Sequence, residues 1–285
     1  NNDPEGIIRV GAPGSGEIRV FDISAATTSK PFGYLGSDAL YGDCRVRLEY
    51  RWGTKQFAPR ATGKRDAGFI YHIQGADALW PRCGECQIQE GDTGDVWLIR
   101  GLSASTTVVD ALVNPRRYRV NGAAYTPAAT SGSYLRIQRA AETADRLTEW
   151  NQVEVILAGD EATHLVNGTV AARLRALRQI GSSAPLTRGR IALQAEGAEI
   201  VYRGIAVRPL AFTLAPPGAT VLFDGSGAAA WQTWQGNADC PWAVDAGALT
   251  VVPQTGDIRT RAVFGDCRLH LEFAVPAVAS DVEQA

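Results

Sequence analysis

The 285-residue sequence contains no methionine, only three histidines and almost no net charge. Its 28 basic and 30 acidic residues leave a formal charge of −2, so it lacks the basic excess that attracts nucleic acids and anionic membranes. No apolar run approaches the roughly 18 residues that a transmembrane helix needs. We therefore expect no nucleic-acid partner and no membrane span. No N-terminal signal is visible, and because methionine is missing we expect the chain either to begin after a processing or cloning boundary or to lack some of its residues in the given sequence.

Several familiar catalytic motifs are also missing. The sequence has no Gly-x-Ser-x-Gly nucleophile elbow, no phosphate-binding loop, and no Gly-x-Gly-x-x-Gly between a strand and a helix. The residues 11–16 (GAPGSG) are glycine-rich but lack the lysine and the following helix of a phosphate loop, so we interpret them as a turn. Serine-hydrolase, nucleotide-hydrolase and dinucleotide-dependent chemistry are therefore disfavoured.

The five cysteines do not form a recognisable framework, because an odd number cannot pair completely within one chain. Cys83 and Cys86 form a single C-x-x-C, whereas a zinc site needs a second such pair or two suitably spaced histidines. We interpret Cys86 as a small buried strand residue and Cys83 as a loop residue.

A repeat is clear in the sequence. Residues 42–50 (GDCRVRLEY) and 265–273 (GDCRLHLEF) are identical at six of nine positions. The two copies begin at Gly42 and Gly265, and a repeat spaced so far apart indicates a duplicated domain. The Pro-Pro pair within residues 210–218 is typical of an extended connector. We therefore expect a first domain at residues 1–212, and a linker with the start of an incomplete second copy at 213–285. We expect residues 218–285 either to pack against the first domain or to belong to a longer chain.

Hydrophobic patterning predicts strands almost throughout. Residues 44–52 alternate strictly between apolar and charged side chains, and Asn167-Gly168 is a strong two-residue hairpin signal. Only residues 140–146 or 171–177 could support a helical turn. Further expected strands are 69–73, 86–90, 96–100, 134–138, 152–158, 162–166, 169–172, 190–194 and 200–207. We predict an all-β fold, an antiparallel β-sandwich of the jelly-roll type.

The densest group of functional side chains lies in residues 80–97 (WPRCGECQIQEGDTGDVW). On a strand, Glu85, Gln87 and Gln89 share one face, and Cys86 and Ile88 share the other. Carboxylate and amide groups suit sugar hydroxyls or a hard cation. Nearby rings such as those of Tyr71 and Trp80 could stack on sugars, although buried core aromatics look the same in sequence. The alternative is a solvated sheet face followed by an acidic hairpin.

Other polar residues allow two interpretations each. His72 could serve as a general acid or base, or could be a hydrogen-bonded structural residue. Glu49 and Arg51 could belong to an ordinary charged sheet face or to the floor of a concave one. His164 precedes the predicted hairpin turn, and we expect it to be a surface or packing residue.

Together these residues resemble the 3-keto-disaccharide hydrolase domain family. The resemblance depends on Tyr71-His72, on Trp80-Pro81 and on residues 85–97 (ECQIQEGDTGDVW). Residues 42–43, 48–50, 150–151, 164–168 (HLVNG) and 189–194 (GRIALQ) are similar to the same family. The resemblance covers nearly all of residues 16–210, and residues 222–225 (LFDG) with Trp231, Trp242 and 256–258 resemble the opening of a second copy.

The resemblance implies a concanavalin-like β-sandwich in a bacterial secreted or periplasmic protein. It also implies cleavage of 3-keto-glycosides, in which a base removes the C2 proton, the C1 oxygen is eliminated, and water adds to the enone. On this basis the expected catalytic residues are His72 and Glu85, and these two could also hold a divalent cation. The expected substrate-binding residues are Gln87, Gln89, Glu49, Arg51, Tyr71, Trp80 and Asp95.

Two other functions stay open at this point. The same fold could be a non-catalytic carbohydrate-binding module, because fold alone does not decide function. It could also be a structural module whose incomplete second copy docks through a sheet edge. The sequence leaves open the sugar, the linkage, the metal and the oligomeric state.

Overall fold

The computed structural model describes residues 3, 5–24, 32–127, 132–210, 218–225, 227–245, 248–269, 271 and 273. It divides into two units, Asn1–Leu214 and Ala215–Ala285, which we describe separately. The described residues contain strands, turns and bends but no helix, so no helix is available to cross a membrane. The all-β prediction is confirmed.

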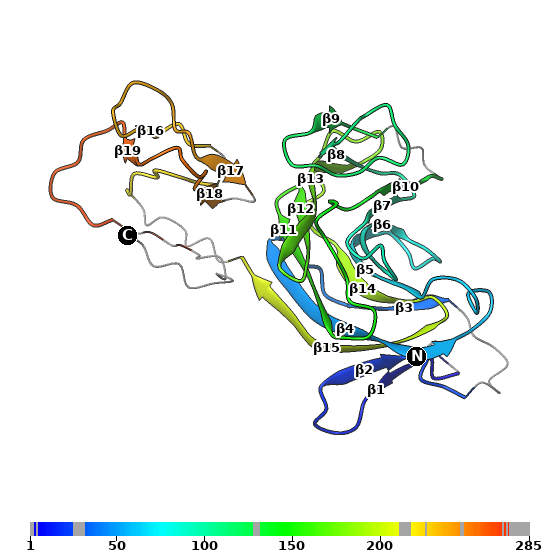
Figure 1. Ribbon diagram of the computed structural model, residues 1–285. Coiled ribbons are helices and arrows are strands. Elements are labelled where there is room, and N and C mark those ends of the chain that lie inside the picture. Colours follow the sequence, from blue (N-terminus) through cyan, green and yellow to red (C-terminus); the bar gives the residue numbers. More distant parts are fainter. Residues whose placement is uncertain are drawn as a thin grey trace. The chain divides into compact units, whose positions relative to one another are not determined.

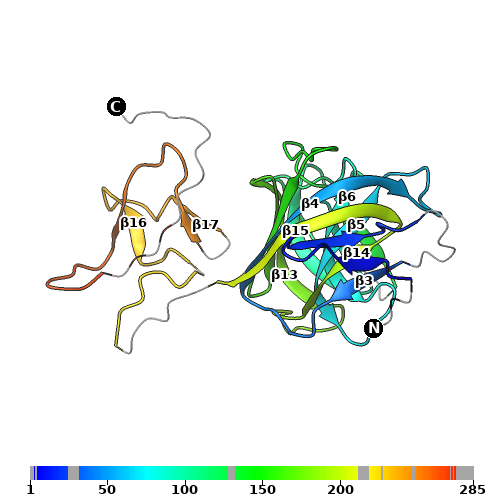
Figure 2. The same cartoon turned by 90° about the horizontal axis from the view of Figure 1, so that it is seen from below.

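The first unit consists of two antiparallel sheets (Figure 1). The nine-stranded sheet has the order β1 (Ile8–Val10), β2 (Glu17–Val20), β15 (Ala198–Pro209), β4 (Cys44–Gln56), β11 (Asn151–Ala158), β12 (Glu161–Val166), β13 (Thr169–Gln179), β8 (Leu102–Val108) and β9 (Ala123–Tyr125). The six-stranded sheet has the order β10 (Tyr134–Ile137), β7 (Val96–Ile99), β6 (Arg82–Gln89), β5 (Asp66–Gln74), β14 (Arg190–Ala195) and β3 (Gly33–Gly36). Figure 2 shows the same strands from below.

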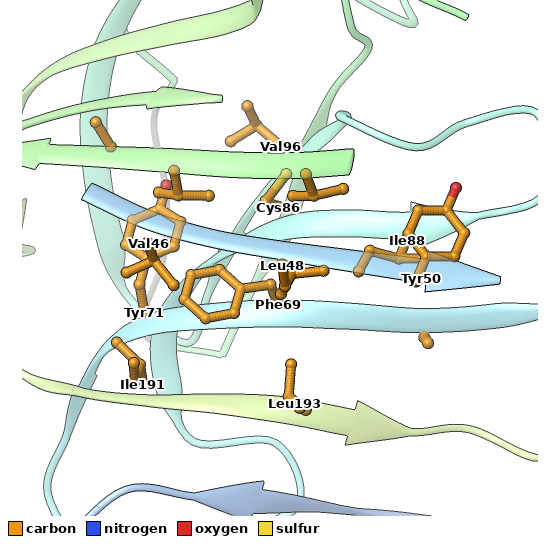
Figure 3. Close-up of a cluster of buried hydrophobic side chains, with 14 of the residues drawn as sticks. Val46, Leu48, Tyr50, Phe69, Tyr71, Cys86, Ile88, Val96, Ile191 and Leu193 are labelled. Carbon is orange, nitrogen blue, oxygen red and sulfur yellow. The ribbon is translucent and has the colours of Figure 1, made fainter. Parts of the chain in front are cut away.

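The core lies between these two sheets. Val46, Leu48 and Tyr50 of β4 are fully buried, while the arginines that alternate with them are exposed. They belong to one hydrophobic cluster with Phe69 of β5 and Cys86 of β6 (Figure 3). Because strand side chains alternate between faces, one apolar face of each sheet is buried and the other face is available for different chemistry.

The hairpin prediction is confirmed. β12 and β13 are joined by Asn167 and Gly168, which have φ values of 50° and 81°. A two-residue turn of this kind requires positive φ at both positions, which asparagine and glycine tolerate best. The suggested helical turn at residues 171–177 is wrong, because these residues lie inside β13 and pair with β12 and β8.

The second unit contains two short strand pairs. β16 (Trp231–Thr233) pairs with β19 (Ile258–Thr260), and β17 (Ala243–Asp245) pairs with β18 (Ala248–Thr250). The repeated segment 265–273 forms no strand at its described positions, and Leu269 and Leu271 are exposed. Its counterpart, β4, pairs with both β15 and β11. In the described part of the second unit, no strand pairs with the repeated segment as β15 and β11 pair with β4. Most of the predicted connector, residues 211–217, lies outside the described residues.

Candidate active site

The outer face of the six-stranded sheet carries the polar side chains predicted from residues 80–97. In β6, Cys86 and Ile88 point into the core, so Glu85 and Gln87 point to the opposite face. Both are nonetheless buried, with 4% and 6% of their surface exposed. A buried carboxyl group away from the core requires polar partners or a changed protonation state.

Glu85 and Gln194 converge over Gly68. In the pairing of β5 with β6, Ile70 lies opposite Glu85 and Gly68 lies opposite Gln87. On the other side of β5, Phe69 pairs with Leu193 of β14, which places Gln194 beside Gly68. A Cβ atom at position 68 would overlap the Oε1 atoms of both Glu85 and Gln194. The absent side chain therefore makes room for the two polar groups.

Three buried carboxyl groups and one arginine form what we call the carboxyl cluster: Asp66, Glu85, Glu196 and Arg60. The two terminal nitrogens of Arg60 each lie 2.6 Å from a carboxylate oxygen, one of Asp66 and one of Glu196. Asp66 also accepts hydrogen bonds from the amides of Gln87, at 2.6 Å, and Gln89, at 2.7 Å. One cation thus faces three acids, which gives the cluster a deficit of positive charge.

This deficit and the burial change the proton affinity of the cluster. Burial raises the pKa of Glu85 well above its ordinary value, and the nearby charges of Glu196 and Asp66 act in the same direction. Burial and Asp66 raise the pKa of Glu196 to about 7, although Arg60 opposes them. Glu85 therefore holds its proton more strongly than an exposed glutamate does, and Glu196, with a pKa of about 7, is divided between acid and base at neutral pH.

Gln194 is a further polar group of this face. It is 1% exposed, and its amide lies close enough to Glu85 to lower the pKa of that carboxyl, yet neither its nitrogen nor its oxygen makes a hydrogen bond of good geometry within the described chain. Buried amides normally have partners, so this one has unused capacity beside Glu85. Such a group suits a ligand oxygen.

The other half of this face is apolar. We call it the apolar patch: Ile70, Ile73, Cys83, Ile99 and Ala192, against which Tyr34, Trp80 and Trp97 pack. Trp97 lies directly opposite Glu85 in the pairing of β6 with β7. Cys83 belongs to β6 and is buried in this patch, so the expectation that it sits in a loop is wrong. The described cysteines are all free thiols.

The structure does not bring His72 to Glu85. The pairings of β5 are irregular between Tyr71 and Gln74, and His72 has a positive φ of 52°. Consecutive residues of a regular strand face opposite ways, yet the rings of Tyr71 and His72 lie 5.6 Å apart. Since Tyr71 belongs to the core, both rings lie on the core side of the sheet, and the predicted His72–Glu85 pair is not formed.

Tyr71 is likewise a core residue, not part of an exposed sugar platform. It is fully buried, and its hydroxyl lies 2.9 Å from Nε2 of His164. Burial lowers the pKa of His72 to about 4 and that of His164 to about 4. Both rings are therefore neutral at pH 7. His164 is a packing residue, and the surface alternative is excluded by its complete burial.

Glu49 and Arg51 lie on the other sheet. Both alternate with the core residues of β4, so they occupy the outer face of the nine-stranded sheet. Glu49 accepts a hydrogen bond of 2.7 Å from Nε of Arg203, and Arg51 lies 4.9 Å from the centre of the Trp150 ring. They form a charged sheet face that is separate from the carboxyl cluster.

The remaining predicted residues adjoin the outer face of the six-stranded sheet. Gln87 and Gln89 hold Asp66, as described above, and Trp80 contributes to the apolar patch. Asp95 is buried and lies 2.6 Å from Arg136, whose guanidinium lies 5.9 Å from the centre of the Trp97 ring. Asp95 thus anchors the arginine beside Trp97.

The carboxyl cluster does not fit a divalent cation. Within the described ranges, no three His, Cys, Asp or Glu side chains are placed to hold a metal ion. Two of the three carboxyl groups of the cluster already bind the cation of Arg60, and His72 lies on the other side of the sheet. We therefore derive no chemical step through a metal.

Sequence reasoning missed four residues of this site: Arg60, Asp66, Gln194 and Glu196. The predicted strands 69–73 and 190–194 stop short of Asp66 and Glu196, although Asp66, Gly68 and Ile70 share one face of β5 and Glu196 stands two residues after Gln194. Pairing those strands with residues 85–89 requires the strand order, which periodicity does not provide.

The comparison with family models decides the family. The model described as the 3-keto-alpha-glucoside-1,2-lyase-like domain matches residues 6–208 and 218–282. The chain belongs to this family. By its family and its two antiparallel sheets, the chain is a carbohydrate-related β-sandwich.

Solved structures with similar folds come from several bacteria. A protein of Parabacteroides distasonis ATCC 8503, provisionally described as a glycosyl hydrolase, is 16% identical, with 74% of this chain and 93% of that chain covered and a TM-score of 0.44. A carbohydrate-binding module from Bacillus subtilis is 11% identical, with 67% and 86% covered and a TM-score of 0.39. Comparison with curated proteins gives no significant match.

Proposed function

We propose that this member of the 3-keto-alpha-glucoside-1,2-lyase-like family cleaves 3-keto-glycosides at the carboxyl cluster. The observation that carries the proposal is that two buried carboxyl groups gather on one sheet face, Glu85 beside Gln194 over Gly68 and Glu196 on the guanidinium of Arg60; burial raises the pKa of each. Elimination beside a ketone needs such a pair: a base for the C2 proton and an acid for the departing C1 oxygen.

Glu196 and Glu85 act as the base and the acid of the elimination. The carboxylate of Glu196 takes the proton from C2, whose acidity comes from the neighbouring C3 ketone. The electron pair of that bond forms the C1=C2 double bond as the C1–O bond breaks, and protonated Glu85 gives its proton to the leaving oxygen. Water then adds to the resulting enone at C1, and C2 is reprotonated. The net change is the glycoside plus water giving the 3-keto sugar plus the alcohol.

Two further side chains support this series of reaction steps. Arg60 binds Glu196 and Asp66 together, so it fixes the position of the base and keeps its pKa from rising further. The unpartnered amide of Gln194 suits the C3 oxygen, on which negative charge develops when the C2 proton leaves. In this proposal Glu196 replaces His72 as the acid–base partner of Glu85.

Deuterium labelling tests the reaction. The full chain is incubated with methyl 3-keto-α-glucoside in D2O, and early product is examined by NMR against an enzyme-free sample. Elimination and hydration place deuterium at C2 of the released 3-keto-glucose faster than spontaneous exchange does. Release of product that keeps hydrogen at C2 contradicts the mechanism.

Variants then test the residues. Glu85→Gln and Glu196→Gln should each lower kcat by about 100-fold or more, the range in which general acid–base groups act. Glu149→Gln, at an exposed position, is the matched control. A large loss of kcat in His72→Gln, with Glu196→Gln unaffected, would restore the histidine as the base. Sugar binding without turnover would instead favour a carbohydrate-binding module.

A further inference from the structure

The alternating arginines of β4 take no part in the carboxyl cluster, and with β15 they make a second polar surface. We call it the arginine face: Arg45, Arg47 and Arg51 of β4, Arg203 and Arg208 of β15, and two glutamates, Glu49 and Glu154. These are the charged residues among residues 44–51 and the residues that pair with them on β15 and β11. Five guanidinium groups against two carboxylates leave an excess of three positive charges here, although the whole chain has a formal charge of −2.

The arginines form the outer layer of this surface. In the ion pair of Arg45 with Glu154, at 2.5 Å, the arginine side chain is 47% exposed and the glutamate side chain 7%. In the pair of Arg203 with Glu49, at 2.7 Å, the exposed fractions are 43% and 27%. The carboxylates thus lie close to the sheet, and a ligand that reaches this surface meets the guanidinium groups first.

Two of the arginines lie directly opposite one another on paired strands. Arg45 of β4 is the registered partner of Arg208 of β15, so their Cα atoms are about 5 Å apart. Arg45 has its carboxylate partner on β11, on the other side of β4, whereas Arg208 is exposed and forms no ion pair with any residue that the structure describes. Like charges in directly opposite positions destabilise a sheet. An anion bound between the two arginines would replace this repulsion with attraction.

Two other guanidinium groups are held in place by an aromatic ring. The guanidinium carbon of Arg203 lies 3.8 Å from the centre of the Trp150 ring, and that of Arg51 lies 4.9 Å from it. A planar guanidinium that is already oriented loses less conformational freedom when its N–H groups bind a carboxylate. β4 and β15 run side by side (Figure 2), and alternate residues of a strand are about 7 Å apart. The face therefore offers fixed positive charges at wide, regular intervals.

We infer that the arginine face binds an acidic polysaccharide, whose carboxylates pair with the guanidinium groups. Arginine and a carboxylate form two parallel N–H···O hydrogen bonds, which makes the pairing selective for planar anions. A polymer of uronic acids carries one carboxylate on each sugar ring, and this low charge density suits widely spaced arginines. The carboxyl cluster lies on the other sheet, so this binding function is independent of the proposed reaction.

Other anionic partners fit this surface less well. Duplex DNA carries one charge for each roughly 1.7 Å of its axis, so an excess of three arginines neutralises little of it. A membrane surface is bound by apolar side chains that insert between the lipids, together with basic ones. The outward positions of residues 45–51 in β4 are all charged, so this part of the strand has no apolar side chain to insert.

Binding of polygalacturonate and of its methyl ester tests the inference, because the two polymers differ in the charge of the carboxylate. The affinity of the full wild-type chain for each is measured by affinity electrophoresis at low and at physiological ionic strength. The double variant Arg47→Gln/Arg208→Gln removes two exposed guanidinium groups of the face. Arg119→Gln/Arg268→Gln is the matched control, since it makes the same change of charge at exposed positions elsewhere.

We expect the wild type to bind polygalacturonate, more weakly as the ionic strength rises, and not to bind the methyl ester. The Arg47→Gln/Arg208→Gln variant should bind at least about tenfold more weakly, because each hydrogen bond to a charged group contributes about a factor of ten or more. The control should bind like the wild type. Equal losses in the two double variants would overturn the arginine face, and so would equal binding of the two polymers or no binding of polygalacturonate.

Two further measurements test the choice of partner and the role of Arg208. Tighter binding of duplex DNA or of phosphatidylglycerol vesicles than of polygalacturonate, lost in the Arg47→Gln/Arg208→Gln variant, would overturn the polysaccharide as the partner. Because Arg208 lies opposite Arg45, Arg208→Gln should leave the urea midpoint of unfolding unchanged or raise it. A clear fall in the midpoint would show that Arg208 stabilises the sheet, and would overturn its assignment to ligand binding.

Discussion

Glu85 and Gln194 approach each other over the backbone of a third strand, although β6 and β14 are not hydrogen-bonded to one another. β5 separates them, and only glycine at position 68 leaves the space in which they meet. The site is therefore produced by the order of strands in the sheet as much as by the polar residues themselves.

Substitution of Gly68 should separate these groups. In Gly68→Ala the added methyl overlaps both Oε1 atoms, and a displacement of about 1 Å can cost about 100-fold in rate. We expect kcat/KM on a 3-keto-glucoside to fall by about that factor. Gly33→Ala is the matched control, because a Cβ there meets no atom within 4 Å. Unchanged activity in Gly68→Ala would show that the convergence of Glu85 and Gln194 is irrelevant to catalysis.

Removal of Arg60 should move the pH dependence of the reaction. The base acts in its deprotonated form, so the rate falls as the pH drops through the pKa of Glu196, about 7. Without the guanidinium, which favours the charged carboxylate, that pKa rises by about 1 to 3 units and the acidic limb moves to higher pH. Arg60→Met is compared with Arg60→Lys, which keeps the charge, and with Lys64→Met at an exposed position. An acidic limb that stays in place in Arg60→Met would remove Glu196 from the role of base.

The alternating side chains of β4 and β6 show which features of the site can be predicted from the sequence alone. A period of two predicts which face Glu85 and Gln87 occupy without any knowledge of their neighbours. His72 breaks that rule, because a bulge in β5 keeps it on the core side with Tyr71, and bulges leave no clear trace in periodicity.

The partners of Glu85 are harder to predict than its face. Glu196 reaches the site from the turn that follows β14, on the far side of β5, and Arg60 reaches it from the segment between β4 and β5. Strand order determines both positions, and local patterning does not encode strand order. The charged face of β4 is the reverse case: Glu49 and Arg51 were expected beside Glu85 in substrate binding, and the structure places them on the other sheet.

Loss of the Tyr71 hydroxyl should affect stability and spare activity. In Tyr71→Phe, Nε2 of His164 loses its partner at 2.9 Å inside the core, which costs about 1 to 3 kcal/mol of unfolding free energy. Because the ring lies on the core side, kcat/KM should stay within about twofold of wild type. Urea unfolding and steady-state kinetics measure the two effects, with Tyr134→Phe as the exposed control. A large rise in KM with unchanged stability would place Tyr71 in substrate binding after all.

The buried histidines should make the protein sensitive to acid. The pKa of His164 is about 4 in the folded chain, whereas an exposed histidine titrates near 6.5. Above about pH 6.5 both the folded and the unfolded state hold a neutral ring, so the group has no effect on stability there. As the pH falls from 6.5 to 4, only the unfolded state binds the proton, and the free energy of unfolding drops by about 3 kcal/mol.

The raised pKa of Glu196 changes stability in the opposite direction between its ordinary value and about 7. The pH dependence of the wild-type unfolding free energy therefore does not identify the histidine by itself. The difference between wild type and His164→Gln isolates the histidine, because the other groups are common to both. Urea unfolding at about pH 7.5, 6 and 4.5 should show that the variant loses less stability in acid than the wild type does. Parallel losses in the two proteins would mean that His164 is protonated in the folded core.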